Sequence, residues 1–420
     1  MDKFIIKGGK KLNGTVRISG SKNAALPILV AGLLIEKGQT VIKNVPDLAD
    51  IDTILKVLNN LGVKTIRNKK EGTVTIDATD IKSYEAPYDL VRKMRASFLV
   101  MGPLLARFNE ARVSLPGGCV LGPRPVDYHI KAFIKMGAKI NEYKGYIKAT
   151  SRGLRGTVIH FDQPSHTGTE NLLMAACLAK GKTTIINAAC DPEVIDVARF
   201  LNRAGAKING AGTNVITIEG VKRLHSVEYS VMADRLEAGT FMIAVGATGG
   251  KVLIKPACED YLGIVIDKLR QTGIKIKSQK DALFVSCENN LNPVDITTFP
   301  YPGFPTDLQA SFMAMCCTNK GLSRIKETVF TERFSHVMEL TRLGADIRVA
   351  GQEAVVRGVK RLKGTSVMAS DIRAGAGLVV AALAASGRSE ILRVYHIDRG
   401  YEHIDEKLRR LGADIKREEV

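Results

Sequence analysis

The chain has 420 residues, which is too long for one ordinary hydrophobic core and predicts two domains of about 200 residues each. Its 61 Lys and Arg residues outnumber 43 Asp and Glu residues, and the net charge of +18 suggests an anionic partner. The basic residues are scattered and aromatic residues make up only 5%, so a phosphorylated small substrate is favoured over the alternative of a nucleic-acid-binding repeat protein.

Membrane and secretion signals are weak in this sequence. The longest apolar runs, such as residues 24–35, are too short or too interrupted for a membrane span, and the N-terminal residues lack the apolar region of a signal peptide. The seven Cys residues include the adjacent pair Cys316 and Cys317, which suits reduced thiols better than a disulfide framework. We therefore expect a cytoplasmic protein without membrane insertion.

An internal repeat runs through the whole chain. Each copy contains an amphipathic segment that ends in a Gly turn and continues into a β-branched run, as a helix with a Gly C-cap does. These glycines, at intervals of 75, 68, 68, 71 and 68 residues, are Gly62, Gly137, Gly205, Gly273, Gly344 and Gly412. The pattern predicts six copies of one structural unit.

A second helix is expected earlier in each unit, because each copy holds a run of small and apolar residues such as AALPILVAGLLI or AGAGLVVAALAA. A helix that is apolar all round is buried. Each unit therefore reads β-α-β-α-β-β, with one buried and one surface helix, and three buried helices are expected inside a ring of surface helices and sheets. A tandem of ordinary α/β sandwiches is the less favoured alternative.

The sixth unit ends one strand early, and the N-terminal segment KFIIKG resembles the missing strand. We therefore expect one domain over residues 21–228 and another built from residues 1–20 and 229–420. The chain would cross between these domains twice. Such a pair of crossings forms a hinge, which is a common location for a substrate cleft.

The first two candidate sites lie at loop-to-helix junctions. Lys22 and Asn23 open the first buried helix, where backbone N–H groups and a lysine attract anions, although a plain helix cap is the alternative. The loop from Leu115 to Asp127 holds three Gly, three Pro and Cys119. Arg124 and the following helix start favour the Cys119 thiolate, and no second ligand at motif spacing supports a metal. Cys119 is therefore the predicted reactive residue.

Charged residues also stand where other buried or surface helices begin. In a single unit each of them is compatible with an ordinary helix cap. At equivalent places in successive units, however, they predict the lining of one cleft. These residues are Arg95, Asp307, Asp371, Arg373 and Arg399.

The repeat and its motifs resemble the enolpyruvyl transferase family. The matching motifs, spread from end to end, are GSKNAALP, MRAS, SLPGGC, RPVDYHI, FPTDLQA, ERFSH, ASDIRA and YHIDRGYE. The Cys loop is typical of members that act on UDP-N-acetylglucosamine. The resemblance implies a two-domain inside-out α/β barrel, built from six repeated β-α-β-α-β-β units, that transfers the enolpyruvyl group of phosphoenolpyruvate to the 3′-hydroxyl of that sugar nucleotide. Transfer to another alcohol, such as shikimate 3-phosphate, is the alternative.

The resemblance also implies roles for individual residues. Cys119 would be the general acid, Asp307 the base, and Asp371 and Arg373 their neighbours. Lys22, Arg124 and Arg399 would hold phosphoenolpyruvate, while Asn23 and Arg95 shape the substrate site. The uridine nucleotide would be contacted by Arg124, Pro125, Val126, Asp127, Tyr128 and Val329. No cofactor, metal or nucleic acid is expected. His166 departs from the sequence that many members have near the diphosphate.

Overall fold

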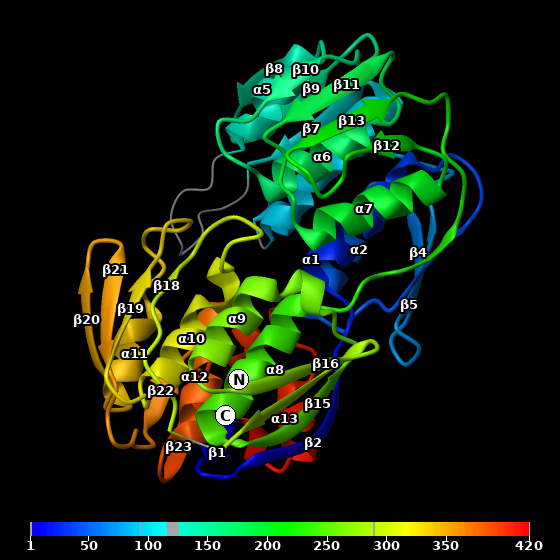
Figure 1. The fold of residues 1–420 in the computed structure, drawn as a ribbon. Helices are drawn as coiled ribbons and strands as arrows, with labels where there is room; N and C mark the ends of the chain where they lie inside the picture. Colours follow the sequence, from blue (N-terminus) through cyan, green and yellow to red (C-terminus); the bar gives the residue numbers. More distant parts are fainter. Residues whose placement is uncertain (1, 93, 116–125, 289, 420) are drawn as a thin grey trace. The chain divides into compact units, whose positions relative to one another are not determined.

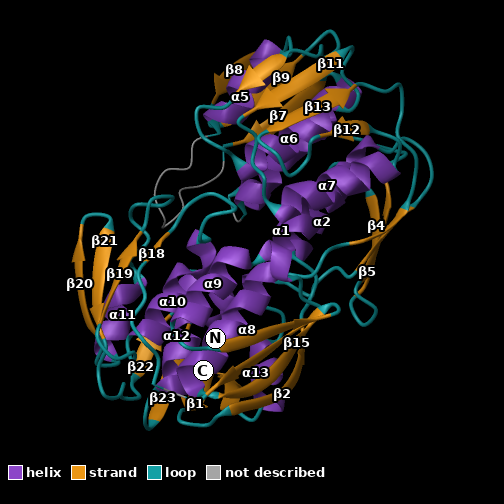
Figure 2. Ribbon diagram, viewed as in Figure 1, coloured by secondary structure: helices purple, strands orange, loops and turns teal. Residues whose placement is uncertain are grey.

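The structure is a computed structural model that describes residues 2–92, 94–115, 126–288 and 290–419. These residues form two compact units, shown in Figures 1 and 2. The inserted unit contains the described residues from 20 to 232, and the terminal unit contains residues 2–19 and 233–419. Each unit has its own core of buried apolar side chains, which runs from Ala24 to Val231 in one and from Phe4 to Ile415 in the other.

Six four-stranded sheets share one plan, as the repeat predicts. In every sheet the first two strands are parallel, and the third and fourth add on in antiparallel orientation. In the inserted unit the sheets are β14(Glu228–Ser230)-β3(Thr40–Lys43)-β5(Thr73–Asp77)-β4(Lys64–Asn68), β6(Glu85–Ala86)-β7(Glu110–Ser114)-β9(Tyr146–Thr150)-β8(Lys139–Tyr143) and β10(Val158–His160)-β11(Lys182–Ile186)-β13(Val215–Glu219)-β12(Lys207–Asn209). In the terminal unit they are β2(Leu12–Arg17)-β15(Gly250–Lys255)-β17(Ala282–Cys287)-β16(Lys275–Gln279), β18(Ile296–Thr297)-β19(Leu322–Lys326)-β21(Glu353–Arg357)-β20(Asp346–Ala350) and β22(Ser366–Met368)-β23(Arg388–Leu392)-β1(Asp2–Lys7)-β24(Asp414–Glu419).

The N-terminal strand β1 occupies an inner position of its sheet. It pairs antiparallel with β23 on one side, where Phe4 is opposite Ile391, and with β24 on the other, where Ile6 is opposite Ile415. Phe4 and Ile6 point into the core and are fully buried. The first and last strands of the chain therefore belong to the same sheet.

Three buried helices form the centre of each unit. In the inserted unit they are α1 (Lys22–Ala31), α4 (Met101–Phe108) and α6 (His166–Ala176), and in the terminal unit α8 (Arg235–Thr248), α10 (Gln309–Cys316) and α12 (Ile372–Ala384). Figure 1 shows α8, α10 and α12 side by side, and all three pack on one another. Small residues permit this close packing; a Cβ on Gly377 of α12, for example, would lie 2.8 Å from the Ala310 carbonyl oxygen of α10.

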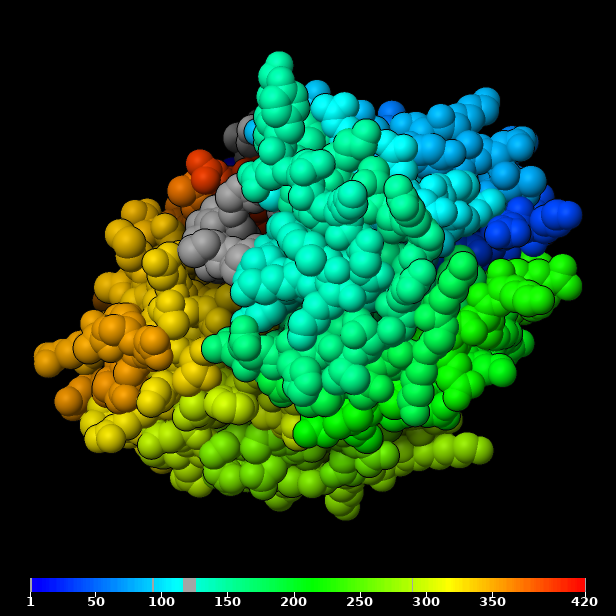
Figure 3. Space-filling view, turned by 90° about the horizontal axis from the view of Figure 1, so that it is seen from above, coloured from blue at the N-terminus to red at the C-terminus, as the bar shows by residue number. Residues whose placement is uncertain are grey.

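Amphipathic helices flank the sheets at the surface. They are α2 (Ala49–Asn60), α5 (Asp127–Lys135), α7 (Pro192–Arg203), α9 (Gly263–Gln271), α11 (His336–Arg342) and α13 (Ile404–Arg410). Shorter helical turns are η1 (Gly32–Leu34), α3 (Tyr88–Val91), η2 (Arg95–Val100), η3 (Glu259–Tyr261), η4 (Thr306–Leu308) and η5 (Val394–Arg399). Figure 3 shows side chains from the cyan and green segments of the inserted unit on one face of the molecule.

The predicted helix-ending glycines all adopt the left-handed backbone that a C-cap requires. Their φ angles are 102° at Gly62, 95° at Gly137, 104° at Gly205, 103° at Gly273, 90° at Gly344 and 96° at Gly412. Side chains other than glycine rarely adopt this conformation. These angles confirm the predicted helix ends. The six sheets of one plan, with three buried helices at the centre of each unit, confirm the sixfold sequence period and the inside-out α/β fold. Within the described ranges, no helix combines the length and the apolar character needed to cross a membrane.

Candidate active site

Three of the predicted site residues, Cys119, Arg124 and Pro125, lie outside the described residues. Their proposed roles therefore remain predictions. The other predicted residues are divided between the two units, and the surroundings of each are described within its own unit.

Lys22 is the first residue of α1 and is 9% exposed. The preceding Ser21 caps the helix, and its Oγ accepts a hydrogen bond from the Ala24 N–H at 3.4 Å. Lys22 Nζ lies 3.2 Å from Oδ2 of Asp50, which is buried on α2. A nearly buried ammonium group beside the exposed N–H groups of a helix start is suited to hold an anion. Asn23 follows in the same helix turn and is partly exposed.

Arg95 opens η2 and lies near His129, a buried residue of α5. Burial, followed by the positive charge of Arg95, lowers the pKa of His129 to about 3. The neutral ring receives a hydrogen bond from Asn171 Nδ2 to Nδ1 at 2.9 Å. Because His129 is neutral, the positive charge of this pair is carried by the Arg95 guanidinium.

The start of α5 carries three of the predicted nucleotide contacts, Val126, Asp127 and Tyr128. Val126 is buried, and the Tyr128 ring packs edge-on against Phe161 at 5.7 Å between centroids. Asp127 Oδ1 is buried and has no hydrogen-bond donor within the described ranges, while Oδ2 lies 3.5 Å from Lys131 Nζ. A buried carboxylate oxygen without a donor is costly, so this atom is suited to accept an N–H from a ligand.

His166 begins α6 and lies between carboxylates. Its Nε2 is 3.0 Å from Glu170 Oε1, and its Nδ1 is 3.6 Å from Asp191 Oδ1. Burial lowers the pKa of His166, but Glu170 and Asp191 raise it more, so the pKa is well above its ordinary value. His166, Asp191 and Glu193 also place possible metal-ligand atoms within 4.8 Å of one another. Because both ring nitrogens already face carboxylates, the arrangement is also that of a hydrogen-bonded imidazolium.

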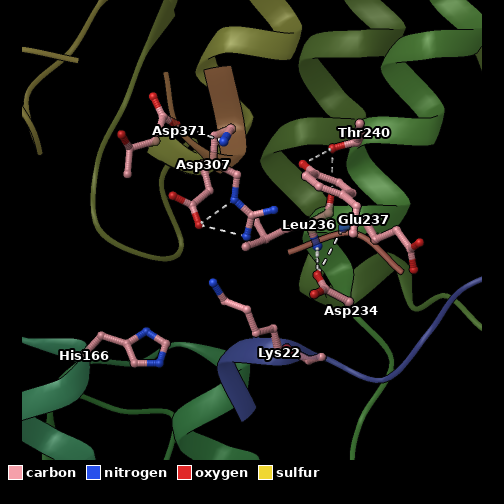
Figure 4. Close-up of polar contacts among 12 residues, drawn as sticks. Lys22, His166, Asp234, Leu236, Glu237, Thr240, Asp307 and Asp371 are labelled. Carbon is pink, nitrogen blue, oxygen red and sulfur yellow. Dashed lines mark hydrogen bonds and ion pairs between the residues drawn. The ribbon is translucent and has the colours of Figure 1, made fainter. Parts of the chain in front are cut away.

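In the terminal unit, Asp307 lies in η4 between two arginines. Arg333 Nη1 donates to Oδ1 at 2.8 Å and Arg373 Nε donates to Oδ2 at 3.2 Å, while Arg373 Nη2 lies 3.1 Å from Oδ2 in an ion pair. Figure 4 shows the Asp307 carboxylate with dashed lines that mark polar contacts of this kind. Both guanidinium groups are buried, and Asp307 is partly exposed. Two charged donors fix the carboxylate plane and favour the ionised form, which is the form that accepts a proton.

Arg373 lies in the first turn of α12, and Asp371 caps that helix. Asp371 Oδ1 accepts hydrogen bonds from the N–H groups of Arg373 at 2.9 Å and Ala374 at 3.0 Å. The Arg373 guanidinium carbon lies 5.2 Å from the centre of the Tyr401 ring. Burial lowers the pKa of Arg373, but Tyr401 and Asp307 raise it more, so the group remains a cation. The cap thus holds the backbone from which Arg373 reaches Asp307.

Arg399 and Val329 complete the predicted set in this unit. Arg399 ends η5 and is partly exposed. Val329 lies in the loop after β19, where its N–H donates to Glu327 Oε1 at 2.9 Å.

Arg333 and Glu327 are functional candidates that the sequence prediction did not include. Arg333 belongs to the motif ERFSH and Glu327 to the preceding KETVF segment, so both stood within recognisable sequence. The sequence signal for these two residues was a charged side chain within a segment that also supplies apolar core residues. What that charge contacts depends on packing between segments that are far apart in the chain.

Comparisons with known proteins agree over the whole chain. Residues 6–408 match the family described as EPSP synthase (3-phosphoshikimate 1-carboxyvinyltransferase). A relative from Nitratidesulfovibrio vulgaris strain DP4, named UDP-N-acetylglucosamine 1-carboxyvinyltransferase, is 54% identical over 420 residues and covers 100% of both chains. A protein of Myxococcus xanthus with the same name is 49% identical over 423 residues, with 100% of each chain covered.

Solved structures show a similar arrangement of elements. The enolpyruvyl transferase NikO from Streptomyces tendae has a TM-score of 0.89 at 25% identity, with 99% of this chain and 98% of that chain covered. EPSP synthase from Acinetobacter baumannii has a TM-score of 0.77 at 19% identity, with 100% of both chains covered, and this second likeness shows the fold alone.

Proposed function

Because the chain belongs to the enolpyruvyl transferase family of EPSP synthase, we propose that it transfers the enolpyruvyl group of phosphoenolpyruvate to the 3′-hydroxyl of UDP-N-acetylglucosamine. The observation that carries this choice of acceptor is the name shared by relatives that are 49–54% identical over their full length. The EPSP synthase structure is only 19% identical, so shikimate 3-phosphate is the less favoured acceptor. The product would enter peptidoglycan precursor synthesis in the cytoplasm.

The reaction needs one acid and one base. A base removes the proton of the sugar hydroxyl as its oxygen bonds to C2 of phosphoenolpyruvate, and an acid protonates the methylene carbon to give a tetrahedral intermediate. Loss of a proton from the new methyl group and of phosphate from C2 then restores the double bond. Asp307 is the proposed base and Cys119 the proposed acid. Two arginine partners keep the Asp307 carboxylate ionised and oriented for its role.

The phosphate and carboxylate of phosphoenolpyruvate require positive charge. Lys22, Arg124 and Arg399 are the proposed ligands, with Arg373 beside Asp307. Lys22 supports this role, because its ammonium group is almost buried at the start of α1. Cations held in place before the reaction stabilise the charge that develops on the leaving phosphate.

The sugar nucleotide would contact a different set of side chains. Asn23 and Arg95 are proposed at the substrate site, with Arg124, Pro125, Val126, Asp127, Tyr128 and Val329 at the uridine nucleotide. The buried Asp127 Oδ1 supports this proposal, since the imide N–H of a pyrimidine would supply the donor that this oxygen lacks in the described part of the chain.

Phosphate release from phosphoenolpyruvate with each candidate acceptor tests the proposal. We expect release with UDP-N-acetylglucosamine and none above background with shikimate 3-phosphate. The reverse pattern would show the alternative activity. Release with neither acceptor would contradict both.

A further inference from the structure

A buried carboxylate outside the proposed machinery lies behind the Asp307 site. Glu327 follows β19, is 0% exposed and forms no ion pair with any described residue. Its Oε1 accepts hydrogen bonds from Thr298 Oγ1 at 2.7 Å and from the N–H groups of Val329 and Phe330, both at 2.9 Å. Its Oε2 accepts one from Thr306 Oγ1 at 2.8 Å. Burying a polar group is costly unless it is hydrogen-bonded, and both oxygens of this carboxyl group accept hydrogen bonds.

The Thr306 hydroxyl connects Glu327 to Asp307. A guanidinium can only donate, so Thr306 Oγ1 accepts from Arg333 Nη1 at 2.9 Å and directs its single proton to Glu327 Oε2. Arg333 Nη1 also donates to Asp307 Oδ1 at 2.8 Å. The direction of each hydrogen bond between Asp307 and Glu327 is therefore defined.

We propose that Glu327 is a positioning residue that sets the orientation of Asp307 through Thr306 and Arg333, and the backbone of residues 329–330 through its other oxygen. This inference rests on the proposed function, in which Asp307 accepts the hydroxyl proton and Val329 contacts the nucleotide. One carboxylate thereby places the base and a segment of the sugar-nucleotide site relative to each other within the terminal unit.

Glu327→Gln separates these two effects. The amide oxygen can still accept from the backbone N–H groups of Val329 and Phe330, but the amide nitrogen that replaces Oε2 is a donor. Thr306 would then face two donors and lose the acceptor for its own proton. Thr306→Val removes the same connection while leaving Glu327 in place. Thr272→Val is the matched control, because Thr272 is another threonine of this unit whose hydroxyl donates a hydrogen bond, in its case to the Leu269 carbonyl at 2.7 Å.

Steady-state kinetics and melting temperature are measured for the full chain and each variant. Misplacement of a base by about 1 Å can cost roughly 100-fold in rate. We expect kcat to fall about 10- to 100-fold in Glu327→Gln and in Thr306→Val, while KM for UDP-N-acetylglucosamine changes less than about threefold. Because both substitutions break the same connection, the double variant should be no slower than the slower of the two single variants. Thr272→Val should lower the melting temperature but leave kcat and KM unchanged. If kcat stays at the wild-type value in Thr306→Val and Glu327→Gln, the proposal is overturned.

A second readout separates this inference from the proposed function. The side-chain carboxyl carbon of Asp307, assigned with Asp307→Asn, is titrated by carbon-13 NMR without substrate. We expect the titration midpoint to move in Glu327→Gln and Thr306→Val but not in Thr272→Val. This result is informative even if wild-type protein releases no phosphate, which would contradict the function alone. An unchanged Asp307 titration in both variants would refute the positioning role.

Discussion

Arg373 of helix α12 donates a hydrogen bond from Nε to Oδ2 of Asp307 at 3.2 Å, and its Nη2 lies 3.1 Å from the same oxygen in an ion pair. The other carboxylate oxygen accepts from Arg333 at 2.8 Å. Asp307, the proposed base, is therefore held from two sides by arginines that follow it by 26 and 66 residues in the chain.

Arg373→Lys tests the two-point contact. A lysine retains the charge but cannot place two nitrogens of a planar group beside one carboxylate oxygen, so Asp307 loses orientation. We expect kcat to fall at least about tenfold and the free energy of unfolding to fall by about 1–3 kcal/mol, as for other buried charged hydrogen bonds. Arg388→Lys is the matched control, because Arg388 is exposed and its ion pair with Glu390 is worth less than about 1 kcal/mol. Equal effects of the two substitutions would argue against a special contact at Arg373.

His166 and His129 should titrate in different pH ranges. The pKa of His166 is raised by Glu170 and Asp191, whereas burial and then Arg95 lower the pKa of His129 to about 3. NMR of the ring Cε1–H groups should show His129 neutral from pH 8 to pH 5 and His166 still charged at pH 7. A His166 midpoint at or below the ordinary value of about 6.5 would contradict this assignment.

The raised pKa of His166 has a consequence for stability. A raised folded-state pKa contributes stability that is complete below the unfolded value of about 6.5 and is lost as the pH rises through the folded value. The loss of unfolding free energy in His166→Gln should therefore be largest below pH 6.5 and shrink at higher pH. Urea unfolding of both proteins from pH 6 to pH 9 measures this difference. A gap that widens toward high pH would have the wrong sign.

The N-terminal strand should be needed for the stability of the terminal unit. β1 lies between β23 and β24, so removing residues 1–8 separates two strands and exposes the core around Phe4 and Ile6. We expect a loss of several kcal/mol, a large part of the roughly 5–15 kcal/mol that stabilises a domain. Melting temperature measures it. A truncated protein with the same melting temperature as the full chain would show that the strand is dispensable.

Cys119 is predicted to be the most reactive thiol toward a small anionic electrophile such as the epoxide fosfomycin. Burial raises the pKa of Cys177 and of Cys316 to about 12, so these thiols should stay protonated and unreactive. Cys119→Ser should lose most turnover, because a hydroxyl is a far weaker acid, while Cys119→Asp should keep activity and resist the epoxide. Peptide mapping after limited labelling identifies the modified residue. Label found mainly on Cys190 or Cys258 would contradict the assignment.

The sequence predicted the parts of this structure that depend on local pattern. The glycine period predicted the six units because each helix end needs a left-handed residue, which the positive φ of Gly62 and its five counterparts confirms. The starts of the buried helices were recognised from a charge ahead of an apolar run, as at Lys22 and Arg373.

Side-chain partners between distant segments were not predictable in the same way. Nothing in the order of residues pairs Lys22 with Asp50, or Glu327 with Thr306, since those contacts exist only after the sheets and helices have packed. His166 was recognised as an unusual residue. Its charge depends on Glu170, four residues further along the same helix, and also on Asp191, which lies 25 residues further along the chain. The role of Cys119 stays a prediction from its loop, because the described residues do not include it.

The most direct test of the central claim is the mass of the product formed from phosphoenolpyruvate and UDP-N-acetylglucosamine. The purified chain should convert the sugar nucleotide to a species in which one enolpyruvyl group has replaced the hydroxyl hydrogen, with one phosphate released per product. Asp307→Asn should lower the rate of both by about 100-fold or more. A sugar nucleotide of unchanged mass, under conditions in which shikimate 3-phosphate gains that group instead, would contradict the account.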